Sequence, residues 1–174
     1  MSRCALIIEV PTAEPLVGAW RTVHDYRANQ GIPAHITSLT PFVRTGLHDE
    51  GVRSVLGGVL AVTAAFDFEL VSVGEFEGTV WLGPEPLTPF VDMQNRLVNA
   101  FPEYLPYGGQ VNDPKPHLTV GQKMSAADQV AVLHDFESEA RPFLPLRCRA
   151  EGLSLFVELA DESWHREEFF AFGR

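Results

Sequence analysis

The chain has 174 residues, of which 45% are hydrophobic and 21% are charged. This composition excludes an intrinsically disordered chain and suits one compact domain. The 23 acidic and 13 basic residues give a formal net charge of −10, which argues against a protein that holds long nucleic acid, because phosphate backbones attract basic surfaces. The excess acid lies in residues 61–110 and 151–174, whereas residues 1–60 and 111–150 are each neutral.

Membrane and disulfide-rich classes are also excluded. The longest stretch without charge or proline, residues 54–66, is shorter than the roughly 20 residues that span a bilayer. The N-terminal apolar run is too brief for a signal peptide, so we expect a cytoplasmic protein that does not contact membranes. Cys4 and Cys148 lie isolated in apolar stretches, which predicts two reduced, buried thiols.

The first half of the chain alternates strands with helices. An apolar run predicts a buried strand over residues 4–10, and apolar side chains three and four positions apart predict an amphipathic helix over residues 16–29. A strand over residues 34–42 and a helix over residues 49–62 follow, and then a two-stranded hairpin over residues 66–76 and 79–82. The alternation of the third strand slips near Ser72, which indicates a β-bulge.

The second half repeats this theme around a long loop. Residues 102–116 form a loop rich in Pro and Gly, and loops of this length in compact domains are usually functional. Ser125 and Asp128 have the spacing of a helix N-cap that resembles a capping box. The pattern predicts helices over residues 87–101 and 125–140, and strands over 117–122, 143–159 and 164–172, the last two joined by an acidic turn.

Two of the predicted strands open on the same short motif. Residues 35–37 read His-Ile-Thr and residues 117–119 read His-Leu-Thr, each with a proline just upstream and each between two predicted helices. The histidines are 82 positions apart, close to half the chain. Two related halves, about 1–86 and 87–174, would place the two motif strands side by side at a pseudo-twofold axis.

The motifs suit the hydrolysis of a phosphodiester. Alternate residues of a strand share a face, so His35 points with Thr37, and His117 with Thr119. Neighbouring strands would bring two imidazoles and two hydroxyls to one pocket. One neutral imidazole can take a proton from water, its protonated partner can donate to a leaving oxygen, and the hydroxyls can donate to phosphate oxygens. A zinc site would need a third ligand at metal spacing.

These motifs, with Pro-Tyr-Gly-Gly at residues 106–109, resemble the 2H (two-histidine) phosphoesterase superfamily and its bacterial 2′-5′ RNA ligase-like branch. The resemblance covers residues 7–170. It implies a single α+β domain, bilobal and pseudo-twofold, with two antiparallel sheets around a central cleft and helices outside. It also implies a phosphodiesterase that uses neither metal nor cofactor and opens 2′,3′-cyclic phosphates to 2′-phosphates, with acid–base roles for His35 and His117 and phosphate-binding roles for Thr37 and Thr119.

Three further residues are candidates for substrate binding. Tyr107 and Lys115 lie in the long loop, where they either contact a base or phosphate or form a packed aromatic and a solvated lysine. Gln122 occupies a position that is often basic in the resembled family, and strand parity predicts that Lys123 faces the His117 side in its place. Arg44 is expected on the solvated surface. The aromatic residues Phe42, Phe76 and Trp81 are expected in the core rather than stacked on a base.

Two other functions stay open from the sequence. The first is a non-catalytic module that binds a phosphate or an RNA end. The second is a 2H enzyme that acts on another small phosphodiester, such as a 2′-5′ oligonucleotide or a cyclic phosphate of ADP-ribose. Ligation is disfavoured as the physiological direction, because hydrolysis is favoured in water. We expect a monomer whose partner is a nucleotide or a short RNA end, and neither a long duplex nor a membrane.

Overall fold

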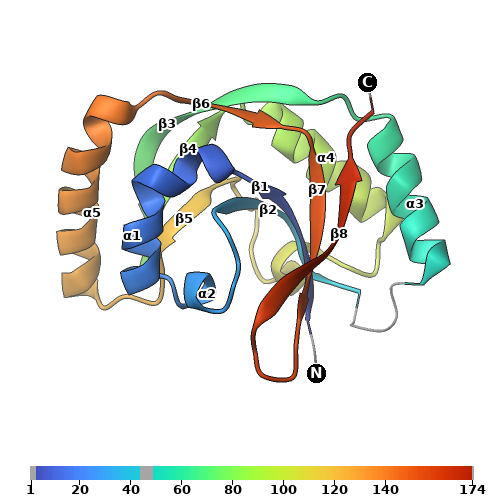
Figure 1. Ribbon diagram of the computed structural model, residues 1–174, viewed down its shortest axis with the longest axis horizontal. Coiled ribbons are helices and arrows are strands. Elements are labelled where there is room, and N and C mark those ends of the chain that lie inside the picture. Colours follow the sequence, from blue (N-terminus) through green and yellow to red (C-terminus); the bar gives the residue numbers. More distant parts are fainter. Residues whose placement is uncertain (1–2, 44–48, 174) are drawn as a thin grey trace.

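The computed structural model describes residues 3–43 and 49–173 (Figure 1). Its strands are β1 (Cys4–Glu9), β2 (His35–Phe42), β3 (Phe66–Phe76), β4 (Thr79–Glu85), β5 (Leu118–Gly121), β6 (Leu146–Ala150), β7 (Gly152–Glu158) and β8 (Trp164–Ala171). Its α-helices are α1 (Glu14–His24), α2 (Tyr26–Asn29), α3 (Glu50–Ala61), α4 (Thr88–Ala100) and α5 (Ala126–Ala140). The 3₁₀-helices are η1 (Pro11–Ala13), η2 (Pro106–Gly109) in the long loop, and η3 (Arg141–Phe143).

The strands form two antiparallel lobes. Within the described part of the chain, their order is β6-β3-β4-β5-β2-β1-β7-β8, and β5 pairs with β2 only at Leu118 and Ile36. Each lobe is thus a four-stranded sheet, and the seam between them runs between the two strands that carry the motifs. The α+β fold predicted from the sequence is confirmed, with the two sheets continuous through one residue pair.

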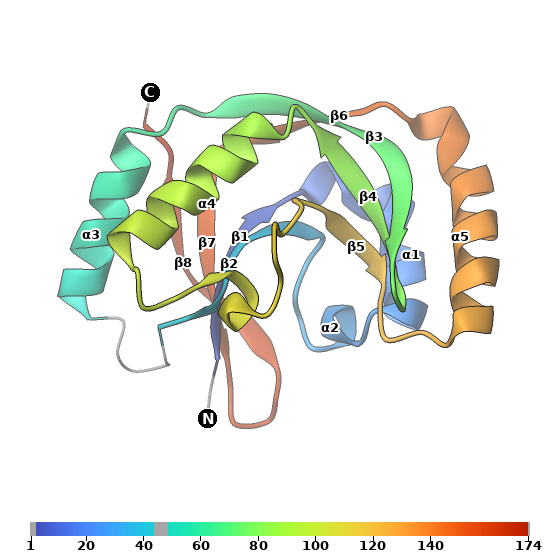
Figure 2. The ribbon, with the colours of Figure 1, turned by 180° about the vertical axis from the view of Figure 1, so that it is seen from behind.

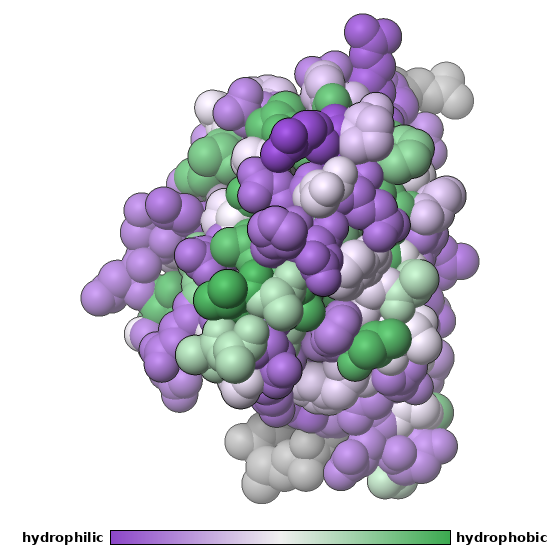
Figure 3. All heavy atoms as spheres, turned by 90° about the vertical axis from the view of Figure 1, so that its left-hand side faces the viewer, coloured by the Kyte–Doolittle hydropathy of each residue, from purple (hydrophilic) through white to green (hydrophobic). Residues whose placement is uncertain are grey.

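The helices lie at the two ends of the sheet. Helices α1 and α5 lie side by side at one end, and α3 and α4 at the other (Figures 1 and 2). Helix α1 precedes the motif strand β2 in the chain but packs on β5, and α4 precedes β5 but packs on β2. Each of these two helices thus covers the lobe that carries the other motif. Hydrophilic side chains cover most of the end formed by α1 and α5, with smaller hydrophobic areas among them (Figure 3).

One hydrophobic core extends through both lobes. It includes fully buried side chains from Leu6 in β1 and Leu155 in β7 to Leu70 in β3 and Leu82 in β4. The predicted buried, reduced cysteines are confirmed, since Cys4 and Cys148 are both buried and neither is in a disulfide bond. None of the helices within residues 3–43 and 49–173 is long and apolar enough to cross a membrane.

The predicted helix over residues 16–29 is wrong at one point. The backbone of Asp25 is extended, with φ −124° and ψ 96°, and it separates α1 from α2. The Asp25 carboxylate accepts a hydrogen bond from the N–H of Arg27 at 3.0 Å and so caps the second helix. The apolar periodicity continues across this break, which is why the pattern alone did not reveal it.

The predicted strand over residues 143–159 is also wrong, because the chain changes lobes at Glu151. Before this residue β6 pairs with β3, and after it β7 pairs with β1 and β8. Other local predictions are confirmed. The register between β3 and β4 shifts between Leu70 and Ser72, and the Ser125 hydroxyl accepts from the N–H of Asp128 at 3.1 Å.

Candidate functional site

The two motifs meet at the seam of the sheet. Ile36 and Leu118, the central residues of the two motifs, pair with one another and are at most 1% exposed, with their side chains in the core. Because side chains alternate along a strand, the histidine and threonine of each motif project from the opposite face. On that face the side chains of all four residues line one cavity of about 720 Å³. These residues are His35, Thr37, His117 and Thr119.

Both imidazoles are held by the same hydrogen bond. Nδ1 of His35 lies 2.7 Å from the carbonyl oxygen of Pro33, and Nδ1 of His117 lies 2.7 Å from that of Lys115. A carbonyl oxygen only accepts, so each Nδ1 carries the proton and donates it. In the neutral rings Nε2 is therefore unprotonated, and each histidine presents this nitrogen as a base.

Burial keeps both imidazoles neutral in the free protein. Desolvation lowers the pKa of His35 to about 4, and the nearby charge of Arg21 adds to this, while the hydrogen bond to Pro33 opposes it. Desolvation also lowers the pKa of His117, against the hydrogen bond to Lys115. At neutral pH the site therefore offers two bases. A bound anionic phosphodiester favours protonation of one of them by Coulomb attraction.

An aromatic pair supports the second histidine. The ring of Phe76 makes an edge contact with the imidazole of His117, with 5.1 Å between the ring centroids. The ring of Trp81 packs against that of Phe76, also with 5.1 Å between centroids. Phe76 is 38% exposed and lines the cavity, so the expectation that it lies in the core is wrong. Phe42, by contrast, is buried in the core as expected.

The long loop reaches the site as its length suggested. Helix η2 lies against β2, and the hydroxyl of Tyr107 is hydrogen-bonded to Thr37. Burial raises the pKa of Tyr107, against the effect of that hydrogen bond, so its hydroxyl stays protonated at neutral pH. Lys115 is exposed and lines the cavity, and its carbonyl group orients His117.

Lys123 lies elsewhere, and the strand-parity argument for it is wrong. Strand β5 ends at Gly121, and Lys123 has φ +58°, so alternation no longer holds there. Its Nζ lies 4.2 Å from the ring centroid of Tyr26, outside the residues that line the cavity. Gln122 lines the cavity in its place. Arg44 lies outside the described residues.

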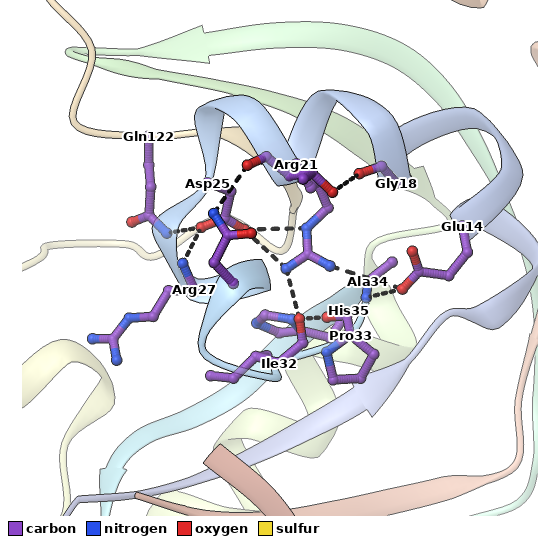
Figure 4. Close-up of polar contacts among 12 residues, drawn as sticks. Glu14, Gly18, Arg21, Asp25, Arg27, Ile32, Pro33, Ala34, His35 and Gln122 are labelled. Atoms are coloured by element: carbon purple, nitrogen blue, oxygen red, sulfur yellow. Dashed lines mark hydrogen bonds and ion pairs between the residues drawn. The ribbon is translucent and has the colours of Figure 1, made fainter. Parts of the chain in front are cut away.

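A buried ion pair joins the surroundings of both motifs (Figure 4). Arg21 is 2% exposed and Asp25 is 1% exposed. Nε and Nη2 of Arg21 donate to Oδ2 of Asp25 at 3.1 and 2.9 Å, and Nη2 also donates to the carbonyl of Ile32 at 3.0 Å. Oδ1 of Asp25 accepts from the amide of Gln122 at 2.6 Å. The network thus ties α1 to the chain entering β2 and to the end of β5.

Sequence reasoning missed this network and one wall of the cavity. Arg21 and Asp25 have the i, i+4 spacing of a helical ion pair, which was the available signal, although such pairs are usually solvated. The wall consists of four residues from three separate parts of the chain, and no repeated pattern marks them in the sequence. These residues are Arg3, Tyr26, Arg27 and Trp164.

Comparison with known proteins agrees with this geometry. The family model described as the 2′-5′ RNA ligase superfamily matches residues 9–162. The search of the curated proteins found no match. Among solved structures, LigT of E. coli complexed with 3′-AMP is 17% identical, with a TM-score of 0.64 and 99% of each chain covered. TT0787 of Thermus thermophilus is 17% identical, with a TM-score of 0.63 and the same coverage.

These similarities concern the whole fold. The segment that the family model matches, residues 9–162, contains both motif strands and the long loop, with the cavity residues that these elements carry. No group of three His, Cys, Asp or Glu side chains in residues 3–43 and 49–173 is arranged to hold a metal ion. The paired motifs at the seam, the fold and the family match together show that the chain belongs to the 2′-5′ RNA ligase superfamily of 2H phosphoesterases.

Proposed function

We propose that this protein hydrolyses 2′,3′-cyclic phosphates of nucleotides or RNA ends to 2′-phosphates, without a metal ion, by acid–base catalysis between His35 and His117. One observation carries the proposal: two imidazoles with the same Nδ1 hydrogen bond line one cavity with two threonine hydroxyls. The nucleotide class is supported by E. coli LigT, of the same fold, which was solved with 3′-AMP, ATP and NADP+.

The proposed reaction needs one neutral and one protonated imidazole. The neutral Nε2 takes a proton from water, whose oxygen attacks phosphorus, and the bond from phosphorus to O3′ breaks. The protonated imidazole donates to O3′, so the products are a 2′-phosphate and a free 3′-hydroxyl. Each positioned acid or base contributes about 10²–10⁴-fold to the rate.

The surroundings of the two rings favour one assignment of roles. Desolvation is the main cause that lowers the pKa of His35 to about 4, so a positive charge on this ring is disfavoured, which suits His35 as the base. His117 is then the acid, protonated once the anionic phosphodiester is bound. The hydroxyls of Thr37 and Thr119 donate to the non-bridging oxygens, where negative charge develops in the transition state.

The test is hydrolysis of the four nucleoside 2′,3′-cyclic phosphates in the presence of EDTA. We expect turnover by the wild type and a loss of about 10²–10⁴-fold in kcat for His35→Asn and for His117→Asn. The double variant should lose little more than either single variant, because the two groups act as a unit. The control is His134→Asn, because this histidine is 82% exposed on α5. Absence of turnover by the folded wild type on all four substrates would contradict the proposal.

A further inference from the structure

One wall of the cavity combines two arginines with two aromatic rings. We call Arg3, Tyr26, Arg27 and Trp164 the arginine wall. The guanidinium carbon of Arg27 lies 4.9 Å from the ring centroid of Tyr26 and 5.3 Å from that of Trp164, and the guanidinium carbon of Arg3 lies 5.8 Å from the latter. The proposed reaction on a single phosphate uses none of these side chains.

Hydrogen-bond donors in this wall lack partners. Nη1 of Arg27 and Nε1 of Trp164 are buried, and neither has a hydrogen-bond partner within the described chain. Trp164 itself is 6% exposed. Buried donors are almost always satisfied, because an unpaired one costs free energy. The two side chains are adjacent and both line the cavity, so their unpaired donors just beneath its surface indicate an acceptor-bearing ligand.

The charge of the wall favours an anion. Arg3 is ion-paired with the buried Glu158, whereas Arg27 makes no ion pair with a carboxylate in residues 3–43 and 49–173. Of the two acids that line the cavity, Asp25 is paired with Arg21, and the other is Asp113. The Arg27 side chain points away from the Arg21–Asp25 pair (Figure 4). The pKa of Glu158 is lowered chiefly by its hydrogen bonds from Arg3 and to a smaller extent by the charge of Arg27. In a chain of net charge −10, the wall therefore carries two guanidinium groups against one carboxylate.

We propose that the arginine wall binds a second phosphate group of the substrate, apart from the cyclic phosphate that is hydrolysed. The substrate is then a nucleotide with a 2′,3′-cyclic phosphate and a further phosphate on its 5′ side. A guanidinium fork with a free Nη1 suits phosphate oxygens, and the indole N–H adds a second donor. The further phosphate is either a terminal 5′-phosphate or the phosphodiester of a preceding nucleotide. This inference rests on the proposed function.

The test compares three matched substrates: adenosine 2′,3′-cyclic phosphate, its 5′-phosphorylated form, and a diadenylate that ends in a 2′,3′-cyclic phosphate. The second and third separate a terminal phosphate from an internal phosphodiester. We expect kcat/KM to be about 10- to 100-fold higher for at least one of them than for the first, as for a charge-assisted hydrogen bond. Arg27→Gln should reduce this ratio toward one. Arg147→Gln, which removes an exposed arginine from another part of the surface, should leave it unchanged.

Binding experiments separate this proposal from the proposed function. Calorimetry compares adenosine 2′,5′-bisphosphate with adenosine 2′-phosphate on the wild type and Arg27→Gln. If no cyclic phosphate is hydrolysed but a preference for the bisphosphate depends on Arg27, the proposed function fails and the subsite stands. Hydrolysis without any preference for a second phosphate would overturn the subsite alone, as would an equal loss on all three substrates in Arg27→Gln. Should Arg27→Gln not fold, Arg27→Lys should retain the charge and only part of the preference.

Discussion

Removing the carboxylate of Asp25 should destabilise the protein more than removing its partner, the guanidinium of Arg21. In Asp25→Ala, the buried guanidinium of Arg21 keeps two partners among the described residues, the Ile32 carbonyl at 3.0 Å and the half-exposed carboxylate of Glu14 at 3.8 Å. A buried charge without its partner costs about 3–5 kcal/mol. In Arg21→Met, the carboxylate of Asp25 keeps the N–H of Arg27 and the amide of Gln122. The carboxylate then also lacks a counter-ion, but its two remaining donors offset part of that cost, so this second loss should be about 1.5–3 kcal/mol.

Urea unfolding of both variants and of Arg21→Met/Asp25→Leu measures these differences. The double variant should be more stable than Asp25→Ala, because it leaves no unpaired buried charge. The control is Asp67→Ala, which removes an exposed ion pair of similar length, 2.8 Å from Oδ1 of Asp67 to Arg149, and should change the urea midpoint little. An Asp25→Ala variant no less stable than Arg21→Met would show that the remaining partners of Arg21 and of Asp25 compensate the two charges equally.

Three predictions concern the site itself. The pKa of His35 is lowered to about 4 in the folded protein, so between about pH 6.5 and pH 4 the folded protein binds fewer protons than the unfolded chain. The free energy of unfolding of the protein should therefore decrease as the pH falls through this window. His35→Asn should flatten that part of the curve of urea midpoint against pH, and an unchanged slope would count against the buried neutral ring. Thr37→Val and Thr119→Val should each reduce kcat by about 10²–10³-fold with little change in Tm, and normal turnover in either variant would remove that hydroxyl from phosphate binding. Phe76→Ala should admit water to the imidazole of His117 and so raise the pKa of His117 toward its ordinary value. NMR titration of the imidazole measures this pKa, and a further decrease would show that desolvation by the Phe76 ring is not the cause of the lowered value.

The part of the site that the sequence predicted is local. His35 and Thr37 share a strand face because they are two positions apart, and the same holds for His117 and Thr119. Two copies of such a motif at half-chain spacing predict convergence without knowledge of the tertiary fold. The placement of Tyr107 at the cavity also follows from a local signal, the long loop directly before the second motif. The assignment of two related halves stays a prediction.

The parts that the sequence did not predict depend on contacts between distant segments. Arg27 and Trp164 are 137 positions apart. The pairing of β8 with β7 and of β7 with β1, and the hydrogen bond from the N–H of Trp164 to the carbonyl of Gln30, bring them to one wall. The helix break at Asp25 depends on its ion pair with Arg21 and on Gln122, which lies 97 positions further along. Lys123 was misplaced because strand parity was extended two residues beyond the end of β5.

The proposed reaction requires that this cavity direct water onto the phosphorus of a 2′,3′-cyclic phosphate. The most direct measurement is ³¹P NMR of adenosine 2′,3′-cyclic phosphate hydrolysed by the wild type in ¹⁸O-enriched water with EDTA. We expect a single product, adenosine 2′-phosphate, with one ¹⁸O atom on phosphorus. A 3′-phosphate product, or unreacted substrate in the presence of folded protein, would contradict it.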